Sequence, residues 1–334
     1  MRLKLGILDQ SPISSGMSAE EALANTVKLA QHAERLGYER FWVSEHHDSS
    51  ALAGSSPEIL AAHIAAKTER IRVGSGGVML PHYSSYKVAE NFKVLEGLTP
   101  GRIELGIGRA PGGMPRATMA LLDGKQRNTD RYPEQVDDLL THLHDLLKEE
   151  DPLYGLKASP VTASVPPVWM LGSSPSSAAL AAQKGLPYTF AQFINGEGGP
   201  RFAEYYRKHF TPSAYLEKPR NMAAVFAICG ETEEEAERIA ASLDIFMLMV
   251  EQGMPVSGIP SPIQASSYQP SPFELKRIQE NRGRMIVGSP SSVKADLLRL
   301  SDEYETEEIM IVPVFYDFQD KWKSIELIAN ECLV

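Results

Sequence analysis

The fold follows most directly from the stretch Arg40-Phe41-Trp42-Val43-Ser44-Glu45-His46-His47-Asp48, in which a short apolar strand runs into a cluster of ionisable side chains. Strand and helix patterns alternate along the chain from its first residues onward. In a barrel of alternating strands and helices, the active site is assembled where the parallel strands end. The cluster after Val43 therefore predicts an enzyme with its active site at the carboxyl end of the strands.

The alternation covers nearly all of the 334 residues. Ser18-Ala19-Glu20-Glu21 forms a capping-box pattern that predicts a helix from 18 to 36, closed by Gly37. Strands are expected near 3–8, 41–44, 71–80, 103–107, 168–171, 188–193, 223–228 and 308–312. Further helices are expected near 57–67, 84–97, 131–148, 175–184, 200–209, 232–249, 291–303 and 318–330. Eight strands, each followed by a helix, predict an α/β fold, a (β/α)8 or TIM barrel, in one domain spanning 1–334.

Two segments interrupt the alternation. Residues 110–128 begin with Ala110-Pro111-Gly112-Gly113-Met114-Pro115, and residues 252–272 are rich in proline and serine. Glycine and proline at this density argue against regular structure. We therefore expect two irregular loops at the rim of the barrel, either of which could close over a ligand.

The balance of charges excludes some classes of partner. The chain has 33 Lys and Arg against 43 Asp and Glu, a formal net charge of -10. A protein with this charge repels nucleic-acid phosphates and anionic membranes. We expect a small-molecule substrate, with no nucleic acid and no membrane as partner.

The cysteines and the amino terminus indicate the compartment. Cys229 and Cys332 form neither a CxxC motif nor a metal-ligand spacing, which favours a reducing environment. The amino terminus lacks the apolar core of a signal peptide. No apolar run approaches the roughly 20 residues of a membrane helix. These features predict a cytoplasmic protein.

The histidine pair after the second expected strand has three interpretations. Neighbouring strand residues point to opposite faces and no HExxH motif occurs, so we expect no metal site at His46 and His47. An imidazole at a barrel mouth titrates near neutral pH and suits a general acid or base. The third interpretation is an ordinary hydrogen-bonded pair at the rim.

Glycines interrupt the third expected strand, in Val73-Gly74-Ser75-Gly76-Gly77-Val78-Met79. Glycine weakens a strand and marks either a bulge or a place where a ligand lies close to the backbone. The segment alone leaves both interpretations open.

Two further strand ends predict an anion site. Arg109 follows the fourth strand among glycines, where a guanidinium could bind a phosphate or could simply hold the loop. The fifth strand runs through Gly172-Ser173-Ser174-Pro175-Ser176-Ser177 into a helix, whose free amides and hydroxyls suit an anion, although a serine there could only cap the helix. Both features lie at the carboxyl ends of strands, so in a barrel they could bind one phosphate.

In this order, the segments resemble the bacterial luciferase-like monooxygenase family of flavin-dependent barrel enzymes. The resemblance covers nearly the whole length. It rests on 41–47, on Arg72-Val73-Gly74-Ser75-Gly76-Gly77-Val78-Met79-Leu80-Pro81, on Leu98-Thr99-Pro100-Gly101-Arg102-Ile103-Glu104-Leu105-Gly106-Ile107-Gly108-Arg109 and on 172–177.

The resemblance implies roles for residues already singled out. It implies that His46 lies beside the flavin and handles protons, and that the Gly76-Gly77 peptide is cis behind the flavin ring. It assigns the phosphate of the flavin to Arg109, Ser174 and Ser177, and it places Ala191 and Gln192 along the ring. Luciferase-type chains have an acid at the position of Ser173, so phosphate contacts there are expected to differ.

The resemblance also implies a reaction. We expect an FMN-dependent monooxygenase that uses reduced flavin, supplied by a separate NAD(P)H:flavin reductase, and oxygenates a small organic substrate through a flavin C4a-peroxide. The absence of a GxGxxG fingerprint favours this supply over direct nicotinamide binding. Two alternatives remain, an F420-dependent dehydrogenase or reductase and a flavin-binding protein without catalysis. Many relatives pair into homodimers through helices near the second and third units.

Overall fold

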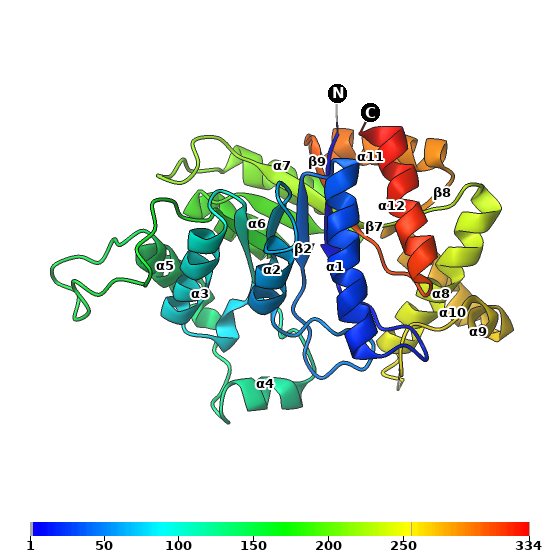
Figure 1. Cartoon of the computed structure of the whole chain (residues 1–334), viewed down its shortest axis with the longest axis horizontal. Helices are drawn as coiled ribbons and strands as arrows, with labels where there is room; N and C mark the ends of the chain where they lie inside the picture. Colours follow the sequence, from blue (N-terminus) through cyan, green and yellow to red (C-terminus); the bar gives the residue numbers. More distant parts are fainter. Residues whose placement is uncertain (1–2, 255, 334) are drawn as a thin grey trace.

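The computed structural model describes residues 3–254 and 256–333, and it contains a closed parallel barrel (Figure 1). Neighbouring strands pair in the order β1-β2-β3-β4-β5-β6-β7-β9, and β9 returns to β1. The strands are β1 Lys4–Asp9, β2 Arg40–Val43, β3 Arg72–Met79, β4 Ile103–Gly108, β5 Val168–Gly172, β6 Tyr188–Ala191, β7 Asn221–Cys229 and β9 Glu308–Val312. They correspond to the eight expected strands, so the TIM-barrel prediction is confirmed.

Helices surround the barrel and follow the strands as expected (Figure 1). They are α1 Ala19–Leu36, α2 Pro57–Ala65, α3 Ser85–Leu98, α5 Tyr132–Leu143, α6 Pro175–Lys184, α7 Gly199–Lys208, α8 Glu233–Glu251, α11 Pro290–Tyr304 and α12 Phe318–Cys332. The predicted capping box of α1 is present, since Ser18 Oγ accepts from Glu21 N and Ser18 N donates to Glu21. Gly37 ends α1 with a left-handed φ of 86°. Helix α5 is shorter than predicted and ends at Leu143.

The two rim segments contain more regular structure than the sequence predicted. A short helix, α4 Pro115–Leu121, lies within 110–128, and α9 Pro262–Ser267 lies within 252–272. The prediction of wholly irregular loops is therefore wrong. Proline stands at the first turn of each helix, where its missing N–H costs nothing.

Two elements beyond these loops were also not predicted. Helix α10 spans Pro272–Arg282, and strand β8 spans Met285–Gly288. Strand β8 pairs only with the second half of β7, so it lies outside the closed barrel. Together with α9 and α10 it builds up the rim beside α8.

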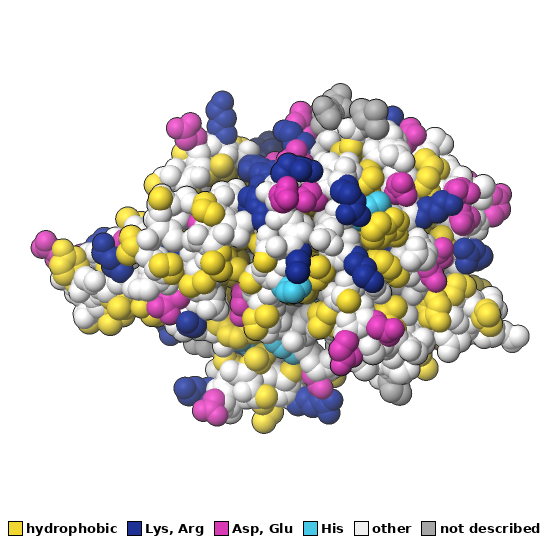
Figure 2. Space-filling model, viewed as in Figure 1, with side chains coloured by type: hydrophobic (Ala, Val, Ile, Leu, Met, Phe, Trp, Pro, Cys, Tyr) yellow, Lys and Arg dark blue, Asp and Glu magenta, His cyan; other side chains and the backbone are white. Residues whose placement is uncertain are grey.

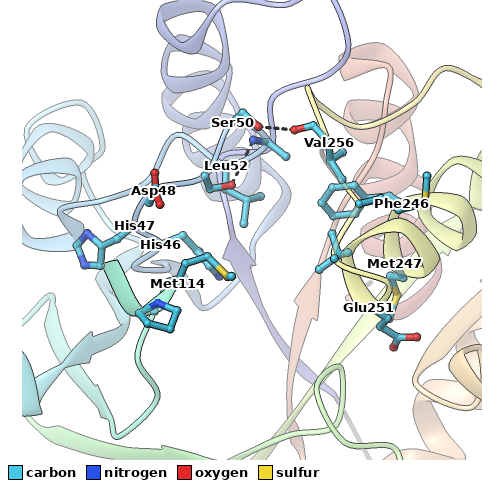
Figure 3. A pocket seen from close by; sticks show the side chains of 18 of the residues that line it. His46, His47, Asp48, Ser50, Leu52, Met114, Phe246, Met247, Glu251 and Val256 are labelled. Atoms are coloured by element: carbon cyan, nitrogen blue, oxygen red, sulfur yellow. Dashed lines mark hydrogen bonds between the residues drawn. The ribbon is translucent and has the colours of Figure 1, made fainter. Parts of the chain in front are cut away.

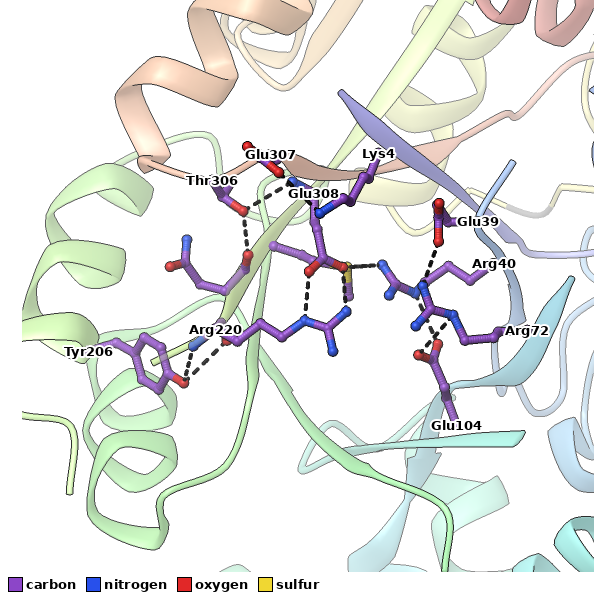
Figure 4. Close-up of polar contacts among 12 residues, drawn as sticks. Lys4, Glu39, Arg40, Arg72, Glu104, Tyr206, Arg220, Thr306, Glu307 and Glu308 are labelled. Carbon is purple, nitrogen blue, oxygen red and sulfur yellow. Dashed lines mark hydrogen bonds and ion pairs between the residues drawn. The ribbon is translucent and has the colours of Figure 1, made fainter. Parts of the chain in front are cut away.

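A buried network of charges fills the amino end of the barrel (Figure 4). Arg40, which is 0% exposed, donates from Nε to Glu104 Oε2 at 3.0 Å and from Nη1 to Glu308 Oε2 at 2.6 Å. Arg220 also pairs with Glu308, and its guanidinium stacks on Trp169 at 4.8 Å. Buried charges are tolerated when they are paired in this way. Arg40, Arg220 and Glu308 stand at or beside strand starts, so this network lies at the amino end of the barrel.

The surface has a mixed charge pattern. On the face drawn in Figure 2, Lys and Arg side chains are interspersed with Asp and Glu. No helix in the described part of the chain combines the length and the apolar character needed to cross a bilayer.

Candidate active site

Two cavities lie at the carboxyl end of the barrel. The first cavity, of about 560 Å³, is lined among others by Trp42, Gly76, Gly77, Arg109, Arg127 and Ser174. The second cavity, of about 920 Å³, is lined among others by His46, Asp48, Arg116, Phe246, Met247 and Glu251 (Figure 3). The side chain of Met79 lies between them. A Cβ on Gly108, which lines the first cavity, would meet Met79 Sδ at 3.5 Å, and one on Gly112, which lines the second, would meet Met79 Cγ at 3.2 Å.

The glycines of β3 form one wall of the first cavity. The Gly76-Gly77 peptide is cis, as the family resemblance implied. The register of β3 against β4 shifts between Ser75 and Val78, so the strand is bulged here. A Cβ on Gly77 would lie 2.6 Å from the carbonyl oxygen of Gly106. The bulge thus places two glycines on the wall of the cavity, where no side chain separates the backbone from a flat ligand.

Arg109 and the start of α6 converge in the first cavity. Arg109 Nη2 donates to Ser176 Oγ at 3.4 Å, and Ser176 Oγ lies 2.9 Å from Ser174 Oγ. Ser174 is the N-cap of α6. Ser177 also lines the cavity, and its hydroxyl donates to the Ser174 carbonyl at 2.7 Å. The three predicted phosphate ligands therefore line one cavity, beside a helix amino terminus.

The same four residues, Ser-Pro-Ser-Ser, open another helix. At α11 they are 289–292, and there the backbone N–H and Oγ of Ser289 donate to Glu233 Oε1 at 3.1 and 2.6 Å. Hydrogen bonds from Ser289 and Ser292 lower the pKa of Glu233, so a carboxylate is stabilised at that helix start. At α6, in the described part of the chain, no carboxylate takes the corresponding place.

Arg127 is a member of the site that the sequence did not reveal. Its Nη2 donates to the backbone oxygens of Arg109 and Ala110, the second at 2.9 Å, and its Nε is buried without a partner. Burial, and then the charge of Arg109, lowers the pKa of Arg127. Among the described residues, neither arginine forms an ion pair with a carboxylate. Two guanidiniums thus face one cavity without a counter-ion.

The resemblance places the backbone of Ala191 and Gln192 beside the ring, and in the structure the side chains of the two residues lie in different surroundings. Ala191, at the end of β6, lines the first cavity. The side chain of Gln192 is engaged elsewhere, because its Oε1 accepts from Tyr304 OH at 2.7 Å. Only the first of the pair therefore faces the cavity.

His46 lines the second cavity. Its Nδ1 lies 3.0 Å from Ser44 Oγ, and its backbone N–H donates to Gly54 O at 2.8 Å. Burial, and then the neighbouring His47, lowers the pKa of His46 to about 4. At neutral pH the ring is therefore uncharged, with one nitrogen that donates a hydrogen bond and one that accepts.

His47 makes different contacts. Its Nε2 lies 2.7 Å from Oε1 of Glu45, a carboxylate that is 1% exposed, and Tyr83 OH donates to the same oxygen at 2.8 Å. The backbone N–H of His47 donates to Gly112 O at 2.7 Å, which fixes the start of the 110–128 segment. Of the two histidines, His46 has fewer partners and suits chemistry better.

The chain matches one protein family and several individual proteins. The family model described as luciferase-like monooxygenase matches residues 3–304. The uncharacterized protein YwcH of Bacillus subtilis is 57% identical, over 98% of both chains. An N-acetyl-S-alkylcysteine monooxygenase of the same organism is 38% identical, over 99% of this chain and 98% of the relative. Among solved structures, apo-MsnO8 is 37% identical with a TM-score of 0.92, over 99% of this chain and 98% of that one.

More distant structures share the fold alone. They include a Baeyer-Villiger monooxygenase of Pseudomonas putida in complex with FMN, 20% identical over 99% of this chain and 97% of that one, with a TM-score of 0.72. They also include an F420-dependent secondary alcohol dehydrogenase, 13% identical over 99% of both chains, with a TM-score of 0.70. The fold is therefore compatible with either cofactor.

Proposed function

Because the chain belongs to the luciferase-like monooxygenase family, we propose that it binds reduced FMN in the first cavity and uses oxygen to oxygenate a small organic molecule in the second. The observation that carries the choice of cofactor is the pair of arginines, Arg109 and Arg127, without carboxylate partners among the described residues. FMN ends in a phosphate monoester with up to two negative charges. F420 has a phosphodiester with only one, so two guanidiniums without carboxylate partners fit the terminal phosphate of FMN better.

The start of α6 completes the phosphate site in this proposal. Ser174 and Ser176 offer hydroxyls beside Arg109, and the helix start has a partial positive charge. The Ser-Pro-Ser-Ser sequence at α11 supports this assignment, since there it holds the carboxylate of Glu233. The same local structure at α6 would hold the phosphate.

The remaining wall of the first cavity suits a flat ring. Gly76 and Gly77 present bare backbone, and a Cβ on Gly76 would come within 2.5 Å of Leu8 and crowd Trp42. Ala191 is small and lies on the same cavity. These residues would orient the ring and exclude water from one of its faces.

Reduced FMN, when bound, supplies the electrons that activate oxygen, and the protein supplies position and proton handling. The neutral imidazole of His46 can keep a hydrogen bond to the reacting oxygen atom without adding charge. Its Nδ1 is held by Ser44, so the ring keeps a fixed orientation. A separate NAD(P)H:flavin reductase would supply the reduced cofactor. A thioether, a group that the S-alkylcysteine in the name of the 38% identical relative contains, is one candidate for the reacting group.

Anaerobic calorimetric titration tests the proposal. The protein should bind reduced FMN about 10 to 100 times more tightly than reduced riboflavin, because only FMN has a phosphate for the charged hydrogen bonds. F420 titrated under the same conditions should bind more weakly than FMN. Equal affinities for FMN and riboflavin, or tighter binding of F420, would contradict it.

A further inference from the structure

We propose that the second cavity takes an uncharged, largely apolar organic molecule, and that Asp48 sets this preference by neutralising Arg116. The inference rests on the proposed function, because it names the class of substrate for that reaction. It is carried by the walls of the cavity and by the pairing of every charge that lines it.

The walls are mostly apolar. Figure 3 shows His46 and Met114 on one side of the opening and Phe246 and Met247 of α8 on the other. Leu52, Val250 and Val256 add aliphatic surface. Methionine side chains adapt their shape to a ligand and have no charge to offer it. Binding in such a cavity is driven by the removal of apolar surface from water.

The first charged pair lies at the mouth. Arg116, at the start of α4, donates from Nη2 to Asp48 Oδ1 at 2.7 Å and from Nε to Oδ2. This is a bidentate contact, which satisfies both oxygens of the acid. Asp48 has a left-handed φ of 54°, and this turn brings its carboxylate to α4.

The second charged pair lies across the cavity. Arg284 Nη2 donates to Glu251 Oε1 at 2.8 Å, and Arg277 donates to both oxygens of Glu251. Burial raises the pKa of Glu251, but hydrogen bonds from Arg277, Arg284 and Asn281 outweigh burial and leave the pKa below its usual value. Glu251 therefore stays ionised beside its arginines.

A charged substrate would find no free counter-ion in this cavity. Each arginine that lines it has a carboxylate partner, and His46 is neutral at pH 7. A carboxylate entering the cavity would have to displace Asp48 from Arg116 or remain unpaired beside apolar walls, which is unfavourable. An ester or another neutral molecule of the same shape avoids this cost.

The test uses a pair of probes, one charged and one neutral. They are an N-acetyl-S-alkylcysteine and its ethyl ester, titrated calorimetrically into the full-length protein. The neutral probe also has two more carbons, so the variants below separate the effect of charge from that of size. The wild type should bind the ester about ten times more tightly than the acid, because the carboxylate of the acid would leave water without gaining a charged partner. Equal binding of the two probes, or tighter binding of the acid, would overturn the proposal.

Three variants test whether Asp48 causes the preference for the neutral probe. Asp48→Asn tolerates the left-handed backbone and frees Arg116. Because the Arg116 side chain is 82% exposed and solvent screens its charge, the substitution should tighten binding of the acid about threefold to fivefold and leave the ester unchanged. Adding Arg116→Ala to Asp48→Asn should abolish that gain. Asp296→Ala breaks a surface pair with Arg299 that lines neither cavity, so it controls for the loss of one negative charge. If Asp48→Asn changes the acid no more than Asp296→Ala does, Asp48 has no such role.

These outcomes are independent of the cofactor. Titration of FMN decides the proposed function, whereas the probe titrations need no flavin. Tight FMN binding with equal affinity for acid and ester would therefore reject only the neutral-substrate inference.

Discussion

The two cavities lie on the same rim and are each lined by two arginines, yet they differ in how those arginines are paired. Arg109 and Arg127 in the first cavity have no carboxylate partner among the described residues, while Arg116 and Arg284 in the second each bind one. A ligand in the first cavity thus meets two arginines without carboxylate partners, whereas the two arginines of the second cavity are already paired. The chemistry of each cavity therefore depends on the partners of its charges and not on their number.

The largest effect should come from His46, which tests the chemistry of the second cavity without touching the first. His46→Ala should reduce the yield of oxygenated product about 100-fold, the usual scale for loss of a group that handles protons. FMN affinity should change less than about threefold, because His46 does not line the first cavity. Mass spectrometry measures the yield of oxygenated product. Hydrogen peroxide release measures the oxygen that is reduced without oxygenating the substrate. An unchanged yield would remove His46 from the chemistry.

The next largest effect concerns the unpaired arginines of the first cavity. Arg109→Ala should weaken FMN about 30-fold and leave riboflavin unchanged, since a charged hydrogen bond contributes roughly 1.5–3 kcal/mol. Arg127→Ala should act in the same direction. Arg116→Ala, in the second cavity, is the matched control and should leave FMN affinity as it is. Equal losses for FMN and riboflavin would show that the arginine holds the loop and not the phosphate.

These predictions rest on features that the sequence revealed to different degrees. The barrel could be predicted because buried parallel strands and helices alternate with clear periodicity. Arg109 and Ser174 could be placed together because both follow strand ends, and parallel strands bring such ends to one rim. Gln192 was placed by resemblance alone, and its side chain contacts Tyr304 and not the cavity.

Other features lacked a periodic signal. Arg127 comes from the interior of the 110–128 segment, and only the three-dimensional course of that segment brings it to Arg109. Strand β8 has four residues and one neighbour, too little for a pattern. Helices α9 and α10 were missed because proline was interpreted as a breaker. Ser261-Pro262-Ile263-Gln264 and Ser271-Pro272-Phe273-Glu274 are capping boxes that could have revealed them.

A smaller effect is expected on stability as a function of pH. The pKa of His46 is lowered from 6.5 to about 4 in the folded chain, so between these values the unfolded chain binds a proton that the folded chain does not. Stability should therefore fall as the pH is lowered through this window, by about 1–2 kcal/mol after allowance for solvent at the cavity. Urea unfolding of the wild type and His46→Gln at pH 7 and pH 4.5 measures it. A difference between the two proteins that does not change with pH would leave His46 without this role.

The smallest effect on FMN affinity is expected from substitutions at the two Ser-Pro-Ser-Ser helix starts. Ser176 links Arg109 to Ser174 through contacts of 3.4 and 2.9 Å, and its side chain is exposed. Ser176→Ala should weaken FMN only about threefold, because an exposed hydrogen bond contributes roughly 0.5–1 kcal/mol. Ser291→Ala alters the equivalent residue of α11, where Glu233 already occupies the helix start, and it should leave FMN affinity unchanged. Equal effects of the two substitutions would mean that the α6 start does not contact the phosphate, and the first cavity would then hold its anion through the arginines alone.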